Sequence, residues 1–571
     1  MAARGMFAVA GFALVAGIAG AGARADHDSA QGNGSALDAW SQATGADAPT
    51  LITAEDGATQ LVWTGAASLD LYARDATGGE LLTPLTSGAF YALGVQGDWR
   101  GETQEGERSW AQIATTLSND PALLPGTAQL GSFQAGHATR DWRLTVGDVS
   151  VLHSNLGTST SLRGWNMRQR SEASSLSVAA GVISPSWESL ADPAQRTQPL
   201  RNAVAFRVGK PLTANAVAFG TLQAFDDGSA VGSDAAVSDA AVPLPASGHS
   251  ATVGLNLRRG RFTLQTEVGG SRLKEQDAAY EPGAAVLIDA AWHWPAILLR
   301  AGHRDFSSHF ATLSTTALPG LRETYGNAAW SITPTTTVSL DLRDMLDRNA
   351  GEIPPPPGDP LALPTTQPAR TRAVTLQATT APARLPGASL TVAASRSLGA
   401  NPDGGRNDLD SLSTSLAYTR AQWNAMLGYQ LSQAETGAMP TTNSTLHGVS
   451  AALGRDHANF LPGWGLSAQL RAQLQRQEID GSAGSRLAGI ELRLQLRNDP
   501  WGSVALTGSL AHGRDPNGTR LQQHALRLDA ERQLAKRAAL RVYAAFNDNF
   551  PDTPQIAYSE RVAGAQISYR F

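Results

Sequence analysis

The sequence predicts an all-β protein, a single large antiparallel transmembrane β-barrel of about 26 strands, with 24 as the alternative count. Three observations predict it. Apolar and polar residues alternate with a period of two along most of the chain, the connections between these segments are short and long by turns, and tryptophans gather beside the short connections. After the N-terminal region there is also no apolar stretch of about 18 residues, so membrane passage must rely on a closed sheet.

Residues 1–25 have the pattern of a secretory signal peptide. Arg4 precedes an apolar run over residues 6–18, and Ala23-Arg24-Ala25 predicts cleavage after Ala25. The apolar run is shorter than the roughly 20 residues of a spanning helix. Loss of Arg4 and Arg24 leaves 43 basic residues of the original 45 against 50 acidic ones, a net charge of -7. Such mild acidity argues against nucleic acid as a partner.

Residues 26–66 form a short polar segment, which we expect to be a periplasmic tail or a small plug-like insert before a barrel of residues 67–571. The exported chain has no cysteine, so neither disulfides nor thiolate metal sites contribute to its stability. We therefore expect closure of the barrel to hold it together.

The alternating segments supply the predicted strands. Leu466, Leu470 and Leu474 alternate with Gln469 and polar neighbours, for example, which gives one apolar and one polar face. The predicted strands span residues 67–74, 89–100, 108–118, 127–137, 141–151, 159–169, 174–184, 201–209, 214–225, 250–258, 261–271, 284–294, 296–305, 322–332, 336–345, 371–381, 388–398, 410–419, 421–432, 445–455, 466–475, 490–497, 504–510, 526–531, 540–547 and 561–571. In lipid, such apolar faces need no second layer to cover them.

The connections alternate in length along much of the chain. Short ones lie at residues 258–261, 294–296, 333–335 and 420, and long ones at 226–248 and 346–369. Bacterial barrels have short periplasmic turns and longer extracellular loops, and an even strand number returns both termini to the periplasm. The sequence predicts this topology.

Tryptophan positions agree with it. Nine of the 13 tryptophans fall beside predicted short turns. Amphipathic rings settle at membrane interfaces, whereas packing in a soluble core would predict no such bias. We expect contact with outer-membrane lipid and a periplasmic aromatic girdle that includes Trp142, Trp292, Trp294, Trp330, Trp423, Trp464 and Trp501.

Signals of chemistry are weak. There is no G-x-S-x-G, H-E-x-x-H, phosphate-binding loop or C-x-x-C motif, so we expect no enzyme, and no catalytic, cofactor or metal residue. Asp403, Asp408 and Asp410 supply oxygen atoms suited to Ca²⁺, but their spacing differs from the calcium-loop template and favours a solvated turn. His293, between two tryptophans, fits a lumen-facing polar residue.

Seven charged residues near the C-terminal end have the parity of lumen-lining positions: Arg471, Arg493, Arg497, Arg527, Asp529, Glu531 and Arg541. Their arginines could form a basic stripe that guides anionic solutes or polymers. Alternatively, the arginines pair with Glu491, Asp529 and Glu531 on neighbouring strands.

The final strand ends on an aromatic residue, with Ile567, Tyr569 and Phe571 on one face. In this respect the chain from about residue 67 resembles the bacterial outer-membrane β-barrel superfamily, whose last residue is recognised by the barrel-assembly machinery. The resemblance implies an outer-membrane location and that machinery as a partner.

A narrower resemblance covers about 25 residues. Residues 142–148, W-R-L-T-V-G-D, and Leu162-Arg163-Gly164 look like the Gly-Asp and Arg-Gly elements in early strands of fimbrial ushers. Ushers interrupt the barrel with a plug domain, whereas no long insertion follows Arg163. The plug of a TonB-dependent transporter would need far more than residues 26–65.

The expected function follows from size. Barrels of about 16 to 18 strands leave an aqueous channel and those of about 22 hold a plug, so about 26 strands enclose a wide lumen. We expect the outer loops, residues 26–66 or a periplasmic or lumen-filling partner to occupy part of it. The preferred hypothesis is a conduit for a large cargo, such as an exported polysaccharide. The alternatives are a general diffusion porin, a structural barrel around a lipoprotein or cytochrome, and usher-like protein export.

Overall fold

A computed structural model describes most of the chain beyond residue 50. The described residues are 51–53, 59–78, 86–103, 106–124, 126–171, 173–184, 186–191, 200–227, 246–275, 279–314, 318–349, 352–353, 365–366, 369–400, 405–437, 442–481, 484–498, 500–515, 519–550 and 557–571. The unit Met1–Thr50 lies outside them, and so do the predicted signal peptide, most of residues 26–58 and Asp403. Within the described part, no helix is long and apolar enough to cross a membrane.

The wall strands are β2 (Thr59–Gly78), β3 (Gly88–Thr103), β4 (Arg108–Ser118), β5 (Ala128–Ala138), β6 (Trp142–Leu152), β7 (Thr158–Arg170), β8 (Ser175–Ile183), β9 (Arg201–Thr213), β10 (Ala216–Asp227), β11 (Ala246–Arg259), β12 (Phe262–Glu275), β13 (Glu281–His293), β14 (Ile297–Phe306), β16 (Leu321–Thr333), β17 (Thr336–Asp347), β20 (Ala369–Thr380), β21 (Ala388–Ala400), β22 (Arg406–Arg420), β23 (Trp423–Gly437), β24 (Thr442–Leu461), β25 (Trp464–Ile479), β26 (Ser485–Asn498), β27 (Gly502–Arg514), β28 (Arg520–Ala535), β29 (Ala538–Asn549) and β30 (Tyr558–Arg570). The short elements are β1 (Leu51–Thr53), β15 (Leu313–Ser314), β18 (Glu352–Ile353), β19 (Thr365–Thr366) and the helix α3 (Trp187–Ala191).

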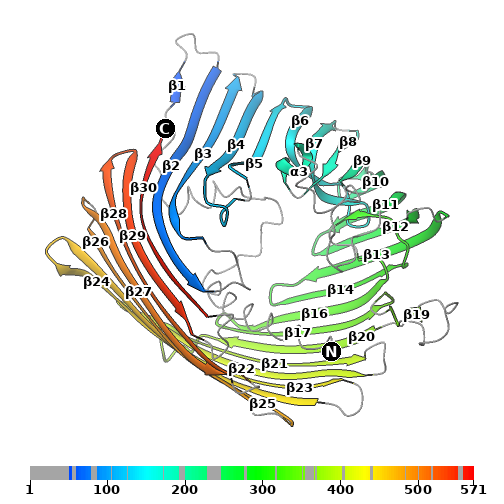
Figure 1. Cartoon of the computed structure of the whole chain (residues 1–571). Coiled ribbons are helices and arrows are strands. Elements are labelled where there is room, and N and C mark those ends of the chain that lie inside the picture. Colours follow the sequence, from blue (N-terminus) through cyan, green and yellow to red (C-terminus); the bar gives the residue numbers. More distant parts are fainter. Residues whose placement is uncertain are drawn as a thin grey trace, which may run out of the picture. The chain divides into compact units, whose positions relative to one another are not determined.

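Each wall strand pairs antiparallel with the next, and β30 also pairs with β2, from Ala66 opposite Arg570 to Gly78 opposite Tyr558. Figure 1 shows this ring, with red β30 beside blue β2. The described residues therefore form a closed barrel of 26 strands, which confirms the larger predicted count. Pairing across the closure begins at Ala66, beside the predicted barrel start at residue 67. Beyond it, Gly65 and Phe571 exchange two backbone hydrogen bonds of 3.0 Å.

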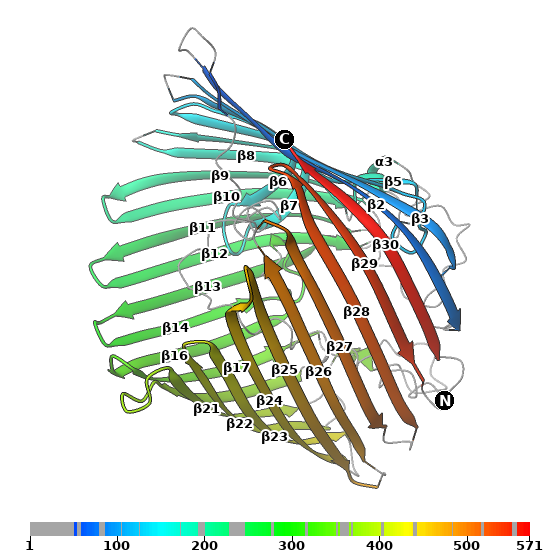
Figure 2. The same cartoon turned by 90° about the vertical axis from the view of Figure 1, so that its left-hand side faces the viewer.

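The alternating sequence sets which face of each strand points outward. Leu492 in β26 stands opposite Leu470 in β25 and Gly508 in β27, while its neighbour Glu491 stands opposite Arg471 and Ser509. A shift of one residue would bring charged groups to the apolar face, so the pattern fixes the register. Figure 2 shows the strands running side by side at a tilt around the wall.

The short connections predicted from sequence are confirmed. Residues 260–261, 334–335 and 421–422 are the only ones between their flanking strands. Gly260 has a φ of 59° and Ala421 a φ of 51°, the left-handed conformation that such tight turns use. Both predicted long connections, 226–248 and 346–369, include many residues outside the described part.

Candidate functional site

The hairpin of β6 and β7 leaves the barrel wall and turns into the lumen. β5 pairs with β6 only up to Gly147, and β7 pairs with β8 only from Arg163 onward. Between these points and the tip of the hairpin, the side chains of Val149, Val151 and Leu162 are buried against Ala179, Ala203 and Phe225 of the wall strands β8 to β10.

The contacted face of the wall is the inner one. Its residues alternate along the strands with Val204, Leu222 and Val253, whose side chains are 47, 56 and 61% exposed on the opposite side. Because successive side chains of a strand point to opposite faces, the covered face is the lumen face.

Polar side chains anchor the hairpin tip to this wall. His153 Nε2 lies 2.9 Å from Ser177 Oγ. The amide group of Gln223 lies 2.7 Å from both Thr158 Oγ1 on the hairpin and Ser250 Oγ on β11. These bonds bring strands far apart in sequence into one network, and buried polar groups need such partners.

A buried carboxylate, Glu267 on β12, holds the end of the tip. Its Oε2 accepts a hydrogen bond of 3.2 Å from the backbone N–H of Leu156, and its Oε1 accepts one of 2.6 Å from Thr252 Oγ1. Glu267 is 1% exposed and Leu156 is fully buried. Both carboxylate oxygens therefore have partners, one from the tip and one from the wall.

The connection between β14 and β16 packs on the hairpin. Within it, β15 pairs parallel with β7, Leu313 opposite Thr158. Thr312 Oγ1 donates to the carbonyl oxygens of Leu156 and Gly157 at 2.8 and 2.9 Å. Phe306, Phe310 and Leu321 surround Leu156 in an apolar cluster. We call the hairpin tip, residues 149–162, together with residues 307–314, the inner plug. These outer connections fill part of the lumen, and outer loops were one of the three occupants expected from the sequence.

Two glycines permit the bend of the hairpin. Gly147 and Gly164 stand opposite each other in β6 and β7. Gly147 has a φ of 100°, and a Cβ there would lie 2.2 Å from Phe133 O; one at Gly164 would lie 2.1 Å from Ala180 O. Only glycine allows this close approach of the backbones without a shift.

The two usher-like sequence segments meet at this bend. Asp148 and Arg163 are opposite in register and form an ion pair of 3.4 Å. The helix α3 packs beside them: Trp187 Nε1 donates to Asp148 Oδ2 at 3.0 Å, and the Arg163 guanidinium lies 5.5 Å from the Trp187 ring centre. The segments thus fix the place where the wall opens.

Because β6 leaves the wall beyond Gly147, residues 128–133 of β5 are not paired with β6 and form an open strand edge. Two of its N–H groups donate to side chains instead of to a strand: Phe133 to Asp148 Oδ2 at 2.7 Å, and Leu130 to Glu188 Oε1 of α3 at 2.6 Å. An unpaired strand edge within a membrane is costly because lipid offers no hydrogen bonds. Asp148 and α3 therefore seal the gap.

A second polar network lies on the inner wall near the closure of the barrel. Asp529 on β28 accepts hydrogen bonds from Arg527 Nε at 2.7 Å and from Arg541 Nε at 2.9 Å. Both guanidinium groups lie within 5.7 Å of the Tyr543 ring centre, and the Tyr543 hydroxyl donates to Asp70 of β2 at 3.0 Å. The network links β28, β29 and β2.

The seven predicted lumen residues share the inner face. Arg493, Arg527, Asp529, Glu531 and Arg541 line one open hollow of about 350 Å³. Arg471 stands opposite Glu491 in register, and Arg497 lies on β26 two positions beyond Gln495. Charge pairing holds at Asp529, whereas Arg493 has no ion pair among the described residues. A role of these residues in transport stays a prediction.

The connection after β4 folds over the inner face of β2. Asp120 is fully buried, accepts a 2.5 Å hydrogen bond from the Tyr72 hydroxyl and forms a salt bridge with Arg74. Burial alone would raise the pKa of Asp120, but the hydrogen bonds from Arg74 and Tyr72 outweigh it and hold this pKa below its usual value. The ionised Asp120 thus holds this loop against the inner face of β2.

The outer surface is an apolar belt. Leu69, Leu528, Val542 and Ile567 lie on its outer face and are between 38 and 51% exposed. A closed sheet with its apolar side outward is stable in lipid and not in water. The chain is a transmembrane β-barrel that encloses a lumen lined with polar side chains.

The predicted girdle tryptophans lie at the short-turn end of this barrel. Six of them are exposed, Trp142, Trp292, Trp294, Trp330, Trp423 and Trp501, and Trp464 is half-buried. Trp292 and Trp294 stack with ring centres 5.0 Å apart, so His293 between them points to the other face. Ile567 and Tyr569 lie on the outer face of the barrel, and recognition by the assembly machinery stays a prediction.

No family model matches the sequence, and no curated protein matches it. Among solved structures, the translocation pore of the P pilus usher PapC matches 89% of this chain and 99% of its own, with 10% identity and a TM-score of 0.36. OprD of Pseudomonas aeruginosa matches 65% of this chain and 94% of its own, with 10% identity and a TM-score of 0.33. OmpF of Salmonella typhi matches 52% and 92%, with 12% identity and a TM-score of 0.28.

Within the described residues, no group of three or more histidine and acidic side chains is placed to hold a metal ion. Asp410 pairs with Arg396 at 3.5 Å, and Asp408 accepts a backbone hydrogen bond from Gly399 at 3.3 Å. Each of these two carboxylates therefore already has a partner within the barrel.

Sequence reasoning missed the inner plug and its anchors His153, Leu156, Thr158 and Glu267. Its strands alternate like the others, so the pattern predicted wall strands. One signal was present: the inner-face positions of β10 and β11 carry Thr221, Gln223, Ser250 and Thr252 rather than charges, and all four are buried. Small hydroxyl and amide groups there fit a covered surface.

Proposed function

We propose that the barrel is a conduit for a large polar cargo, most simply an exported polysaccharide. The observation that carries the proposal is the asymmetry of the inner wall. Strands β8 to β13 are covered by the inner plug, while inner-face residues of β25 to β28, such as Arg471, Arg493, Arg527 and Glu531, are exposed. A 26-strand barrel is wide, and the proposed path of the cargo runs beside the inner plug, along the part of the wall whose described inner-face residues are exposed.

The open wall suits a hydroxyl-rich or anionic chain. Three arginines face two carboxylates in its hollow, so single hydrogen bonds are available while the net charge stays small. Transport requires contacts that form and break easily, because tight binding would stop the cargo. The proposed function needs no catalytic residue, cofactor or metal, and it includes lipid, the assembly machinery and a periplasmic or lumen-filling partner as expected partners.

Planar-bilayer recordings of the full barrel test the proposal, with dextran as a neutral polymer and polygalacturonate as an anionic one. We expect open-channel current that polygalacturonate interrupts briefly and repeatedly. The double variant R493Q/R527Q should shorten these interruptions several-fold, because it removes two exposed inner-wall charges. R370Q/R372Q is the matched control, since both arginines lie on the outer face of β20, near Asp344.

A barrel that shows no current under any condition would contradict the conduit and favour a structural sheath around a partner. Steady current that neither polymer interrupts would favour a general diffusion porin. Equal effects of the inner and outer double variants would contradict the assigned path. Removal of residues 26–50, which precede the wall strands and leave β2 (Thr59–Gly78) whole, separates the contribution of that segment from that of the inner plug in a parallel sample.

A further inference from the structure

The outer face of β9 to β12 has a hollow of about 480 Å³ in its apolar surface. The cross-strand rows explain it. In one row, the bulky Phe206 and Leu222 are followed by Ala251 and Gly270. The next row toward the short turns is bulky again, with Val253 and Val268, which are 61 and 48% exposed. Small residues between large ones leave a trough in the belt.

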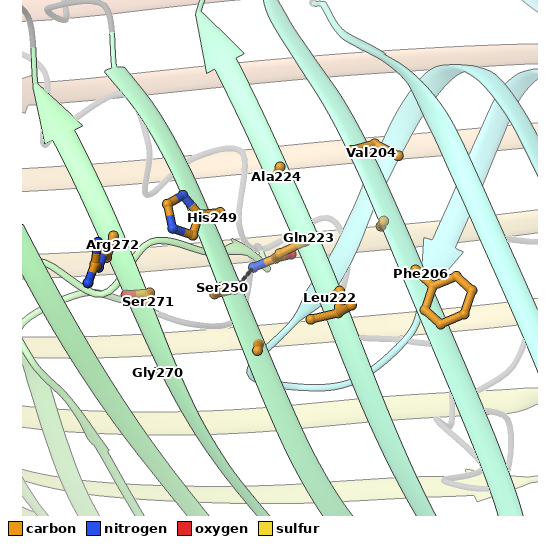
Figure 3. Close-up of a pocket in the computed structure, with 12 residues that line it drawn as sticks. Val204, Phe206, Leu222, Gln223, Ala224, His249, Ser250, Gly270, Ser271 and Arg272 are labelled. Carbon is orange, nitrogen blue, oxygen red and sulfur yellow. Dashed lines mark hydrogen bonds between the residues drawn. The ribbon is translucent and has the colours of Figure 1, made fainter. Parts of the chain in front are cut away.

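Cationic and aromatic groups border the trough on the side of the long loops. His249 and Arg272 stand opposite each other in the adjoining row, and Lys274 follows on the same face of β12. Figure 3 shows His249 and Arg272 on neighbouring strands to one side, and Leu222 and Phe206 to the other. The Tyr280 ring centre lies 5.7 Å from that of His249.

The charge at this border is positive. Arg272 is exposed, and neither Arg272 nor Lys274 has an ion pair in the described part of the chain. Among the described residues of the outer face, the nearest acidic one along these rows is Asp226, which stands two strands from Lys274, with Ser247 between them. Glu281 has the opposite parity, opposite Leu273, and pairs with His309.

The height of Arg272 places it at the outer leaflet. Phe262 lies on the same face of β12 at the short-turn end, where its ring contacts Trp292 at 5.7 Å. Ten residues separate it from Arg272, about 33 Å along the strand at roughly 3.3 Å per residue. At a tilt of about 40° this is about 25 Å along the barrel axis, the height of the apolar band. Arg272 is thus level with the lipid head groups farthest from the periplasm.

We infer that this hollow binds one phosphorylated, multiply acylated glycolipid of the outer leaflet. Its phosphate contacts Arg272 and Lys274, and one acyl chain lies in the trough over Ala251 and Gly270. Charge complementarity and position select this occupant: basic side chains recognise lipid phosphates, and the adjoining surface is apolar. The site is separate from the lumen and does not depend on the cargo.

Native mass spectrometry of the full barrel with bisphosphorylated hexa-acyl lipid A tests the inference. One tightly retained lipid A is expected, with phosphatidylethanolamine retained at least tenfold more weakly. R272Q/K274Q should weaken retention at least tenfold, and so should G270L, which fills the trough; a Cβ at Gly270 meets only Gly283 O, at 4.0 Å, so the fold tolerates it.

The matched controls are R370Q/R372Q, two outer-face arginines elsewhere, and G326L, where a Cβ has open space on the outer face of β16. Both should retain lipid A like the parent chain. Absence of a retained lipid A, equal retention of phosphatidylethanolamine, or losses equal in the controls would overturn the site. Heat-modified gel migration confirms that each variant is folded.

Discussion

Leu156 should decide whether the inner plug stays against the wall, and L156A is the sharpest test of the plug. Its side chain is fully buried among Phe306, Phe310 and Leu321, while its backbone N–H donates to Glu267. Truncation leaves the hydrogen bond in place and removes only the apolar contacts. The released hairpin exposes residue 156 to water, so the change weakens the docked state alone.

Burial of this type is worth about 2 to 5 kcal/mol in leucine-to-alanine variants. At about 3 kcal/mol, the ratio of released to docked hairpins rises about 150-fold, since each 1.4 kcal/mol is a factor of ten. Because release opens the covered side of the lumen, single-channel recordings should show more frequent transitions to a larger conductance, up to that factor.

Leu152 provides the matched control. It lies at the end of β6 in the same hairpin, but its side chain is 55% exposed. L152A should change the opening frequency by no more than about twofold, because exposed truncations shift stability by less than about 0.5 kcal/mol. The reasoning is refuted if L156A opens as rarely as the parent barrel, or if L152A has an equal effect.

Three further predictions concern His153 at the hairpin tip, Gly147 at its bend and Asp529 on the open wall. Burial, together with Arg168 and Arg207, lowers the pKa of His153 from 6.5 to about 4. The docked state of the inner plug is therefore fully stable above about pH 6.5 and loses stability as the pH falls toward 4. In bilayer recordings, channel openings should become up to tenfold more frequent per pH unit over this range, and H153Q should abolish this dependence. G147A places a Cβ at positive φ and 2.2 Å from a carbonyl, a cost of about 2 kcal/mol or more, so the barrel should lose its compact gel migration at a lower temperature, whereas G326A should not. D529N leaves two lumen arginines without their shared carboxylate. The interaction of one such charge with a passing ion at about 6 Å in water is worth about 0.7 kcal/mol, so the Cl⁻/K⁺ permeability ratio, measured from reversal potentials at low salt, should rise about threefold. D344N on the outer wall should leave this ratio unchanged.

The strand pattern was readable because it repeats a local rule. Each of the 26 predicted segments overlaps one wall strand, and boundaries differ mainly where strands extend past the membrane belt, as β24 does from Thr442 to Leu461. Among the candidate lumen residues, parity alone placed Arg493, Arg527 and Asp529 on one face. Parity could not show that Asp529 bonds both Arg527 and Arg541, since that depends on side-chain reach across strands.

The sequence by itself determined the all-β class, the face that meets lipid and the short-turn end, because alternation of period two and turn composition act between near neighbours. It left 24 and 26 strands open, and the pairing of β30 with β2 decided the count. Only the tertiary structure decided that β6 and β7 bend at Gly147 and Gly164, and that Glu267 receives the backbone of Leu156, 111 residues away in the sequence. Such contacts join segments whose local patterns are those of ordinary wall strands. The sequence pattern therefore predicted the strands of the wall, and it did not predict which segments fill the lumen.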